Sequence, residues 1–345
     1  MSEVLYRKYP PKGFKDVLGQ EHIVSALSGA LKQGNIAHAY LFSGSRGTGK
    51  TSIARILAQE IKCSPNDLHE IDAASNRGID DIRELREAVT VLPFESPYKV
   101  YIIDEVHMLT KEAFNALLKT LEEPPKHVIF VLATTEIEKL PETIISRCQN
   151  FTFKKPSQKI LKTAVEATAK AEGFTLEPAA ADLIAILGDG SFRDAQGILQ
   201  KVIYSSSDKK VSVKEVEKIA GAPRGGLVND VVSAIQEGKL EEGLKAVSSA
   251  VEENIDMKVF LKMILHKVRS ILLLKYAKDI EGVIKEQFGE EDFGFLKKLS
   301  REAKSKINSN TLNELLLAYD ATGRSYIPQL PLELALIKIL KQDSN

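Results

Sequence analysis

The architecture of this chain follows from Ala39-Tyr-Leu-Phe-Ser-Gly44-Ser-Arg-Gly-Thr-Gly-Lys50-Thr51-Ser-Ile-Ala-Arg55. The apolar run 39–42 predicts a buried strand, and residues 52–61 continue with the periodicity of a helix. Between them stands Gly-x-x-x-x-Gly-Lys-Thr, the phosphate-binding-loop pattern, in the strand–loop–helix context that this pattern requires. The stretch therefore predicts a site for a nucleoside triphosphate, in preference to a glycine-rich turn with a chance lysine.

The chemistry of such a loop rests on its backbone. Glycines let N–H groups curve around an anion, and the N-terminus of the following helix adds partial positive charge. We expect Lys50 to reach the β- and γ-phosphates and the Thr51 hydroxyl to ligate Mg²⁺. The residues predicted to contact the nucleotide here are Gly44, Ser45, Arg46, Gly47, Thr48, Gly49, Lys50, Thr51 and Ser52.

Length and composition limit the alternatives. A chain of 345 residues suggests two or three domains. Its 47 basic and 47 acidic residues balance, so any contact with nucleic acid must come from a local patch. Cys63 and Cys148 cannot form a disulfide framework, and the N-terminus carries no signal-peptide pattern. The apolar stretch 261–276 is too short and too charged to span a bilayer, so we expect a soluble, cytoplasmic protein without membrane contacts.

A second continuous apolar run, residues 100–103, ends in Asp104-Glu105. Runs of this kind are typical of parallel strands buried on both faces, and ligands bind beyond the carboxyl ends of such strands. We expect Asp104 to hold Mg²⁺, partly through water, and Glu105 to orient or deprotonate an attacking water. The alternative is an ordinary acidic loop, but the phosphate loop earlier in the chain favours hydrolysis.

Further strands and helices complete an α/β pattern. Residues 69–73 indicate a short strand, and the run 128–132 predicts a third buried strand that leads into Ala-Thr-Thr135. The Thr135 hydroxyl is a candidate to report on the γ-phosphate, although the isolated signal is weak. Between these strands, a helix is predicted from Lys111 to Glu123, with Thr110 as its N-cap.

Several arginines stand where two interpretations are open. Arg83 and Arg86 lie at positions i and i+3 of a predicted helix, and Arg77 lies in the turn before it. They suit either a nucleic-acid contact or an ordinary solvated face. Arg147 closes a short helix over 140–148, where the helix dipole alone favours a cation.

Arg193 is predicted to lie where the helix dipole disfavours a cation. Ser191 and Asp194 have the spacing of a capping box, which predicts that a helix begins here. A cation in its first turn costs about 0.3–1 kcal/mol against the helix dipole. The placement favours an anionic partner such as phosphate, with a tolerated surface residue as the alternative.

Of three further segments, one reads as a linker and two are each open to two interpretations. The arm that contains Val17 and Leu18 precedes the phosphate loop, where it can cover the adenine or simply pack against the domain. Residues 223–226, Pro-Arg-Gly-Gly, read as the clearest linker. The apolar stripe over 261–272 suits either a core or a partner surface.

Together these motifs resemble AAA+ ATPases, and within them the bacterial DNA polymerase III clamp-loader gamma/tau subunits. The resemblance is dense over residues 4–153, lighter through Gly-Ser-Phe-Arg193-Asp, and mainly a matter of helical content beyond residue 225. The matching blocks are residues 44–51, 70–79 (EIDAASNRGI), 101–109 (YIIDEVHML), 114–125 (FNALLKTLEEPP) and 146–148 (SRC).

The resemblance implies an AAA+ P-loop domain with a parallel sheet over 1–154, a small helical lid domain over 155–222 and an all-helical collar domain over 223–345. It implies that Asp104 and Glu105 are the Walker B pair and act with Lys50. In addition, Thr135 matches sensor 1 and Arg193 matches sensor 2. Val17 and Leu18 would contact the nucleotide from the arm.

Other implied roles lie outside the nucleotide site. Arg147 matches an arginine finger that reaches the nucleotide of a neighbouring subunit, and this role demands an oligomer. Arg77 and Arg83 match the region that follows the phosphates of duplex DNA.

Two departures from the family pattern stand out. Members commonly carry a four-cysteine zinc module, of which only Cys63 is matched, because residues 64–69 replace the rest. One thiol cannot make a tetrahedral structural site, so we predict no zinc. The usual Arg-Pro after Tyr9 is Pro10-Pro11, which alters the arm at the adenine.

The expected function is that of an ATP-hydrolysing motor subunit of the DNA polymerase III clamp loader, with ATP and Mg²⁺ as cofactors. The expected partners are other loader subunits in a pentamer that includes copies of this chain, the sliding clamp, and primer–template DNA. One alternative is another AAA+ DNA motor, such as a branch-migration or recombination-associated ATPase. A second is a non-hydrolysing scaffold subunit of the loader, which the intact loop and Asp104-Glu105 disfavour.

Overall fold

The computed structural model describes residues 3–76, 78–206, 208–285, 288, 290–302 and 305–341. Arg77, one of the two arginines predicted to contact DNA, lies outside these residues. The chain forms two compact units, which are Met1–Ala164 with Gly188–Gly197, and Val165–Leu187 with Ile198–Asn345.

The first unit is built on a five-stranded sheet in the order β2-β3-β4-β1-β5, with every neighbouring pair parallel. The strands are β1 (Ala39–Ser43), β2 (Leu68–Asp72), β3 (Lys99–Asp104), β4 (Val128–Thr134) and β5 (Gln149–Thr152). The three central strands are the continuous apolar runs of the sequence, because each is covered on both faces. This confirms the predicted α/β class and its parallel sheet.

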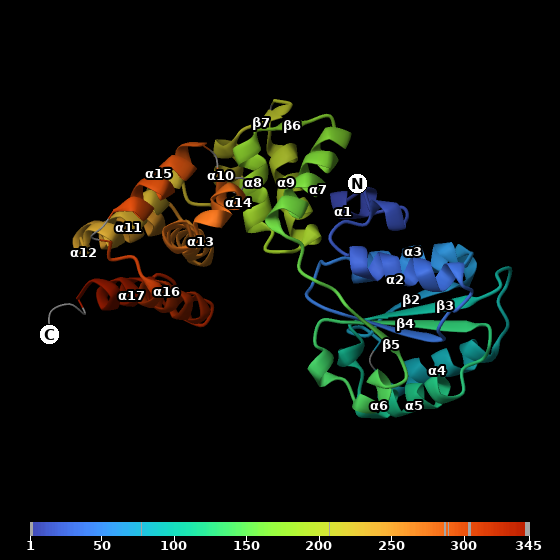
Figure 1. The fold of residues 1–345 in the computed structure, drawn as a ribbon. Coiled ribbons are helices and arrows are strands. Elements are labelled where there is room, and N and C mark those ends of the chain that lie inside the picture. Colours follow the sequence, from blue (N-terminus) through green and yellow to red (C-terminus); the bar gives the residue numbers. More distant parts are fainter. Residues whose placement is uncertain are drawn as a thin grey trace. The chain divides into compact units, whose positions relative to one another are not determined.

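Helices cover both faces of the sheet (Figure 1). Side chains alternate along each strand, so Tyr40 and Phe42 join the core on one face while Leu41 joins the core on the other. One face is covered by α2 (Glu21–Lys32) and α3 (Lys50–Glu60), and the other by α4 (Ile79–Thr90), α5 (Lys111–Glu122) and α6 (Glu142–Ile145). The helix predicted over 111–123, with Thr110 as N-cap, is confirmed, since the Thr110 hydroxyl accepts the N–H of Ala113.

The direction of the strand connections reverses between β1 and β4. The connection after β1 runs to β2 at one side of the sheet, whereas the connection after its neighbour β4 runs to β5 at the other side. Ligands of open α/β sheets bind outside the carboxyl ends of strands at such a reversal. The residues that follow Ser43 and Thr134 therefore line the expected site.

Short elements join these strands and helices. They are α1 (Leu5–Lys8), η1 (Phe14–Asp16), η2 (Pro65–Asp67), η3 (Val106–Met108) and η4 (Ile137–Lys139). From residue 158 onward the chain is almost wholly helical, apart from a two-stranded parallel pair of β6 (Thr175–Leu176) and β7 (Lys210–Val211). The helices are α7 (Gln158–Ala171), α8 (Pro178–Leu187), α9 (Phe192–Ser205), α10 (Val213–Ala220), α11 (Gly225–Glu237), α12 (Leu240–Glu252), α13 (Met257–Tyr276), η5 (Lys278–Ile280), α14 (Glu281–Lys285), α15 (Glu290–Arg301), α16 (Ser309–Thr322) and α17 (Leu330–Lys341).

The predicted linker over 223–226 is partly wrong. Helix α11 already begins at Gly225, so only residues 221–224 connect it to α10. The reason is a side chain from the preceding helix, because the Glu217 carboxylate accepts the N–H of Gly225 at 3.1 Å. That bond satisfies one of the free N–H groups of the first turn, and it allows two glycines to remain helical.

The apolar stripe over 261–272 belongs to a core. Leu261, Ile264, Val268 and Ile271 of α13 are fully buried in one cluster, and the members of this cluster all lie between residues 227 and 340. The alternative of a partner surface is therefore excluded for these four side chains. Among the described residues, no helix has the length and apolar character needed to cross a bilayer.

Candidate nucleotide-binding and hydrolysis site

The phosphate loop connects β1 to α3 with three glycines at positive φ: Gly44 at 143°, Gly47 at 71° and Gly49 at 100°. Other residues rarely adopt these angles. A Cβ on Gly44 would also lie 2.6 Å from the Phe153 carbonyl oxygen. The Gly44 N–H donates to the Thr134 carbonyl at 3.2 Å, which fixes the start of the loop to the end of β4. The loop thus has the backbone that an anion cradle requires.

Lys50 is buried at the mouth of this loop, with 6% of its surface exposed. Its Nζ donates to the Gly44 carbonyl at 2.7 Å and to the Ser45 carbonyl at 3.0 Å. Burial lowers the pKa of Lys50, the carboxylates of Glu105 and Asp104 act in the opposite direction, and the charge of Arg193 lowers it further. The lysine therefore lies within electrostatic range of the other predicted site residues.

Thr51 and Asp104 meet across the sheet edge. The Thr51 hydroxyl donates to Oδ2 of Asp104 at 2.8 Å, and Oδ1 of Asp104 accepts the N–H of Glu105 at 3.0 Å. Two hard oxygen ligands beside a phosphate loop fit Mg²⁺, which binds through one or two protein oxygens and completes its shell with water and phosphate. Within the described residues, no cluster of three or more His, Cys, Asp or Glu side chains offers a metal site built from protein alone.

Glu105 follows β3 in an unusual backbone conformation. Its φ of 49° and ψ of 43° place a residue other than glycine in the left-handed region, at a cost of about 1–2 kcal/mol. Its Oε2 accepts the Thr135 hydroxyl at 2.9 Å. The structure therefore brings together the predicted base and the predicted sensor, from the ends of two adjacent strands.

Arg193 lies in the first turn of α9, next to the loop. The N–H of Phe192 donates to the Gly47 carbonyl at 2.9 Å, and the Arg193 guanidinium stands over the Tyr6 ring at 5.3 Å. The predicted helix start is confirmed, because the Ser191 hydroxyl accepts the N–H of Asp194 at 3.2 Å. The beginning of α9 is thus fastened to the loop by its own backbone.

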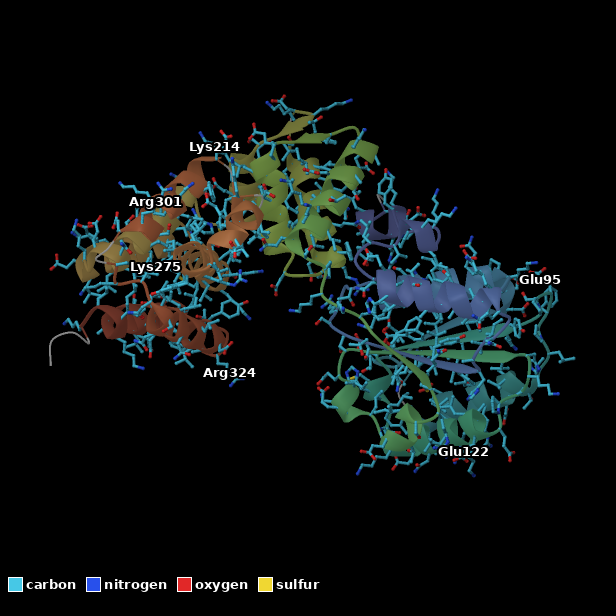
Figure 2. The ribbon with its side chains drawn as sticks, viewed as in Figure 1. Glu95, Glu122, Lys214, Lys275, Arg301 and Arg324 are labelled. Atoms are coloured by element: carbon cyan, nitrogen blue, oxygen red, sulfur yellow. The ribbon has the colours of Figure 1, made fainter. Side chains whose placement is uncertain are left out.

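Arg147 is held on a different part of the same unit. Its Nη2 donates to Oε1 of Glu122 on α5 at 2.7 Å, and its Nη1 donates to the Thr143 carbonyl at 2.8 Å (Glu122 is labelled in Figure 2). It precedes β5, whose first residue Gln149 pairs with Tyr40 at the start of β1. Arg147 therefore lies toward the amino edge of the sheet, whereas the phosphate loop lies at the carboxyl edge.

The remaining predicted contacts make local interactions. Arg83 is 57% exposed and bonds to Asp80 within α4 at 3.1 Å. Val17 packs against the core under α2 and α3, and Leu18 is 39% exposed. The arm is fastened by Gln20, a residue without a predicted role, whose buried amide donates to the Lys154 carbonyl at 2.7 Å and accepts its N–H at 3.1 Å. Packing is thus one function of the arm, while its adenine contact stays a prediction.

Residues 64–69 are secured by a carboxylate. Asp67 is 1% exposed and accepts the N–H groups of Phe94 at 2.5 Å, Glu95 at 3.0 Å and Ser96 at 2.9 Å. Burial acts to raise the pKa of Asp67, but these bonds outweigh it and lower the pKa to about 2. Burial raises the pKa of the Cys63 thiol. The absence of zinc stays a prediction.

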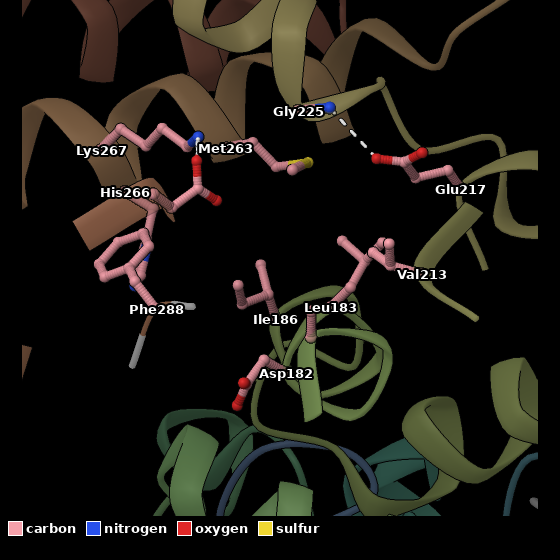
Figure 3. A pocket seen from close by; sticks show the side chains of 12 residues that line it. Asp182, Leu183, Ile186, Val213, Glu217, Gly225, Met263, His266, Lys267 and Phe288 are labelled. Carbon is pink, nitrogen blue, oxygen red and sulfur yellow. Dashed lines mark hydrogen bonds and ion pairs between the residues drawn. The ribbon is translucent and has the colours of Figure 1, made fainter. Parts of the chain in front are cut away.

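A cavity within the second compact unit is shown in Figure 3. Its volume is about 90 Å³, and it lies between α8, α10 and α13. Its polar groups bond to the protein, since Lys267 contacts Asp292 at 2.6 Å and Asn229 at 2.7 Å, and Glu217 accepts the N–H of Gly225. These internal bonds explain the polar lining without a ligand.

His107 was missed as a site residue, although it stands in the quoted block YIIDEVHML. Its side chain is 5% exposed and lies between Glu105, Thr134 and Glu136. A histidine two positions after the acidic pair was the available signal, but its contacts depend on how the end of β4 approaches η3.

The sheet, the phosphate loop after β1 and the helical segments that follow define a P-loop protein of the AAA+ class. The fold is similar to that of the RuvB Holliday junction branch migration motor of Thermotoga maritima, with a TM-score of 0.54 and 22% identity over 68% of this chain and 80% of that one. A family model described as DNA polymerase III, delta subunit, matches residues 19–78 and 64–157.

Two relatives identify the branch of this class. The chain is 38% identical to DNA polymerase III subunit tau of Bacillus subtilis, over 98% of this chain and 63% of that protein. It is 40% identical to subunit tau of Escherichia coli, over 79% of this chain and 46% of that protein. The chain belongs to the AAA+ clamp-loader family as a homologue of DNA polymerase III gamma/tau subunits, which confirms the resemblance; it spans about half to two thirds of these relatives.

Proposed function

We propose that this chain is an ATP-hydrolysing motor subunit of a DNA polymerase III clamp loader, part of the polymerase holoenzyme, which opens the sliding clamp and loads it onto primed DNA. The observation that carries the proposal is one edge of the sheet. There the phosphate loop, Thr51, Asp104, Glu105 and Thr135 meet through bonds of 2.8 Å and 2.9 Å. These are the groups needed to bind a triphosphate and activate water.

In the proposed reaction the loop N–H groups and Lys50 bind the phosphates. Lys50 exchanges its bonds to the Gly44 and Ser45 carbonyls for bonds to phosphate oxygens. Thr51 and Asp104 would hold Mg²⁺, which would supply positive charge to neutralise the charge that develops on the phosphates. The existing bond between these two side chains keeps both oxygens at the mouth of the loop.

Glu105 accepts a proton from the attacking water. Its left-handed backbone turns the side chain out of the direction of β3, and Thr135 holds one carboxylate oxygen. Positioning of this kind is a large part of phosphoryl-transfer catalysis. Arg193, tied to the loop through its helix, is well placed to respond to the γ-phosphate as sensor 2.

Arg147 acts in trans on the nucleotide of a neighbouring subunit. Its position toward the amino edge of the sheet supports this, because that edge is opposite to the loop of its own chain. The proposed assembly is a pentamer of copies of this chain and other loader subunits, in the cytoplasm. The assembly binds the sliding clamp and primer–template DNA, and Arg83 contacts the phosphates of the DNA.

The division into an AAA+ domain over 1–154, a lid over 155–222 and a collar over 223–345 is part of the proposal. Two observations support it. The cores on the two faces of the sheet use residues up to 153, and the cluster around α13 uses residues 227–340. The collar would join the subunits.

The rival AAA+ motors are less well supported. The chain is 22% identical in sequence to RuvB, a level at which the similarity concerns the fold alone. Its sequence identity to tau subunits is 38–40%. A non-hydrolysing scaffold subunit would not need the arrangement of Glu105 and Thr135.

The test is ATP-dependent loading of a labelled clamp onto primed DNA, with candidate partner subunits. Wild type should hydrolyse ATP and load the clamp, and Lys50→Ala should do neither. Lys32→Ala, a change on an exposed lysine of α2, is the matched control and should behave as wild type. Wild-type turnover no higher than that of Lys50→Ala would refute the motor proposal.

A further inference from the structure

We propose that His107 is a positioning residue that couples the carboxylate of Glu105 to the end of β4. The inference rests on the proposed function, since it concerns the group assigned as base. It begins from burial: 5% of the His107 side chain is exposed, although imidazole is polar on two sides. Both ring nitrogens therefore need partners from the protein.

The partners come from two segments. Nδ1 lies 3.0 Å from the Thr134 hydroxyl and 3.5 Å from Oε2 of Glu105, and Nε2 lies 3.2 Å from Oε1 of Glu136. Thr134 ends β4 and Glu136 follows it, while Glu105 precedes the turn η3 that carries His107. The ring thus joins the residue after β3 to the residues that end β4.

The hydrogen bonds close into a cycle. The N–H of Glu136 donates to the Thr134 hydroxyl at 3.0 Å, which leaves that hydroxyl one proton to donate. Nδ1 of His107 accepts it, and Nε2–H donates to the Glu136 carboxylate. The partners assign this tautomer, with the proton on Nε2. In it, every polar group of the cycle has a partner.

The cycle restrains Glu105 from a second side. Thr135 lies between the two cycle residues of the β4 end, Thr134 and Glu136, and donates to Oε2 of Glu105 at 2.9 Å. Because Nδ1 of His107 carries no proton in this tautomer, the ring limits the position of the same oxygen by contact at 3.5 Å and not by a hydrogen bond. A displacement of the β4 end therefore moves the carboxylate as well. Because Thr135 is the proposed sensor, His107 makes the sensor and the base one mechanical unit.

Three variants test this in the full chain, assembled with its partner subunits. His107→Leu removes both polar ends of the ring, and His107→Gln keeps a donor and an acceptor. We expect kcat for ATP to fall about 10²-fold in His107→Leu, the scale of a misplaced catalytic group. The Kd for a fluorescent non-hydrolysable ATP analogue should change less than threefold, and His107→Gln should recover most of kcat. Thr134→Val, which breaks the cycle at its other end, should lower kcat in the same way.

A double-mutant cycle separates positioning from general damage. In a Glu105→Gln background, His107→Leu should cause no further loss of kcat, because the group that it positions is already gone. Equal losses of kcat and nucleotide affinity, a further loss in that background, or no recovery by His107→Gln would overturn the inference. Wild-type hydrolysis by Glu105→Gln alone would instead refute the proposed base and leave the nucleotide site to be reassigned.

If His107→Leu does not fold, the comparison is made with Thr134→Val and His107→Gln alone. A fall in kcat with Thr134→Val, at unchanged nucleotide affinity, supports the coupling. Unchanged kcat in Thr134→Val overturns it, since the cycle cannot close without that hydroxyl.

Discussion

Nη2 of Arg147 donates to Oε1 of Glu122 at 2.7 Å, a contact between side chains that are 33% and 51% exposed. Exposed ion pairs of this kind contribute about 0–1 kcal/mol to stability. An arginine finger contributes on the order of 10³-fold or more to turnover. The two roles of Arg147 therefore differ enough in magnitude to be separated.

The first prediction is that Arg147→Ala leaves the free energy of unfolding within about 1 kcal/mol of wild type and lowers ATP turnover of the assembly about 10³-fold. Mixing Arg147→Ala with Lys50→Ala subunits should restore part of the turnover, because one chain supplies the loop and its neighbour supplies the arginine. Arg301→Ala, on an exposed arginine of α15, is the control. Mixtures no more active than either variant would contradict action in trans.

The second prediction concerns the metal. Asp104→Asn and Thr51→Ala each remove one of the two oxygens that meet at 2.8 Å. The Mg²⁺ concentration for half-maximal ATP hydrolysis should rise about 10–100-fold, the range seen when groups that support a bound metal are lost. Thr51→Ser keeps a hydroxyl and should stay close to wild type. An unchanged Mg²⁺ dependence in Asp104→Asn would remove Asp104 from the metal site.

The core of the site could be predicted because its signals are local. Gly44, Lys50 and Thr51 follow one continuous apolar run, and Asp104 and Glu105 follow another. In a parallel sheet such runs end at the same edge, so the groups must come close together. The bonds at 2.8 Å and 2.9 Å are the outcome of that geometry.

The supports of the site could not be predicted, because they join segments far apart in sequence. The hydrogen bonds between Gln20 and Lys154 join residues 134 positions apart. The contact of His107 with Thr134 depends on the pairing of β3 with β4. Neither pair has a periodicity or spacing that a single sequence displays. The start of α11 at Gly225 escapes prediction for a different reason. The Gly225 N–H donates to the Glu217 carboxylate eight positions earlier, and this bond offsets the low helix propensity of glycine.

The third prediction is that Asp67→Asn destabilises the chain by about 1.5–3 kcal/mol at pH 7, the range for hydrogen bonds to a charged group. Three N–H groups converge on this carboxylate and hold its pKa near 2, below its usual 3.8. Stability from Asp67 is therefore present above pH 4 and is lost as the pH falls toward 2. Urea unfolding between pH 7 and pH 2 measures it.

The control for this measurement is Asp80→Asn, which changes an exposed carboxylate of α4. It should alter the free energy of unfolding by less than about 1 kcal/mol. If Asp67→Asn and wild type lose stability in parallel between pH 4 and pH 2, the carboxylate does not fasten the segment after Cys63 as inferred.

The last prediction concerns the helical unit, where burial lowers the pKa of His266 to about 4, and the charges of Arg269, Lys262 and Lys267 act in the same direction. In the unfolded chain His266 binds a proton near pH 6.5, whereas in the folded chain it does so only near pH 4. The free energy of unfolding should therefore fall as the pH falls across this window. The full difference between the two pKa values of His266 corresponds to about 3 kcal/mol in the free energy of unfolding. His266→Gln should abolish this part of the acid sensitivity, whereas His38→Gln, on an exposed histidine, should retain it. Urea unfolding at pH 7, 5.5 and 4.5 gives the dependence of the free energy of unfolding on pH. If this dependence is identical for wild type and His266→Gln, His266 is protonated in the folded protein as readily as in the unfolded chain, and the prediction is wrong.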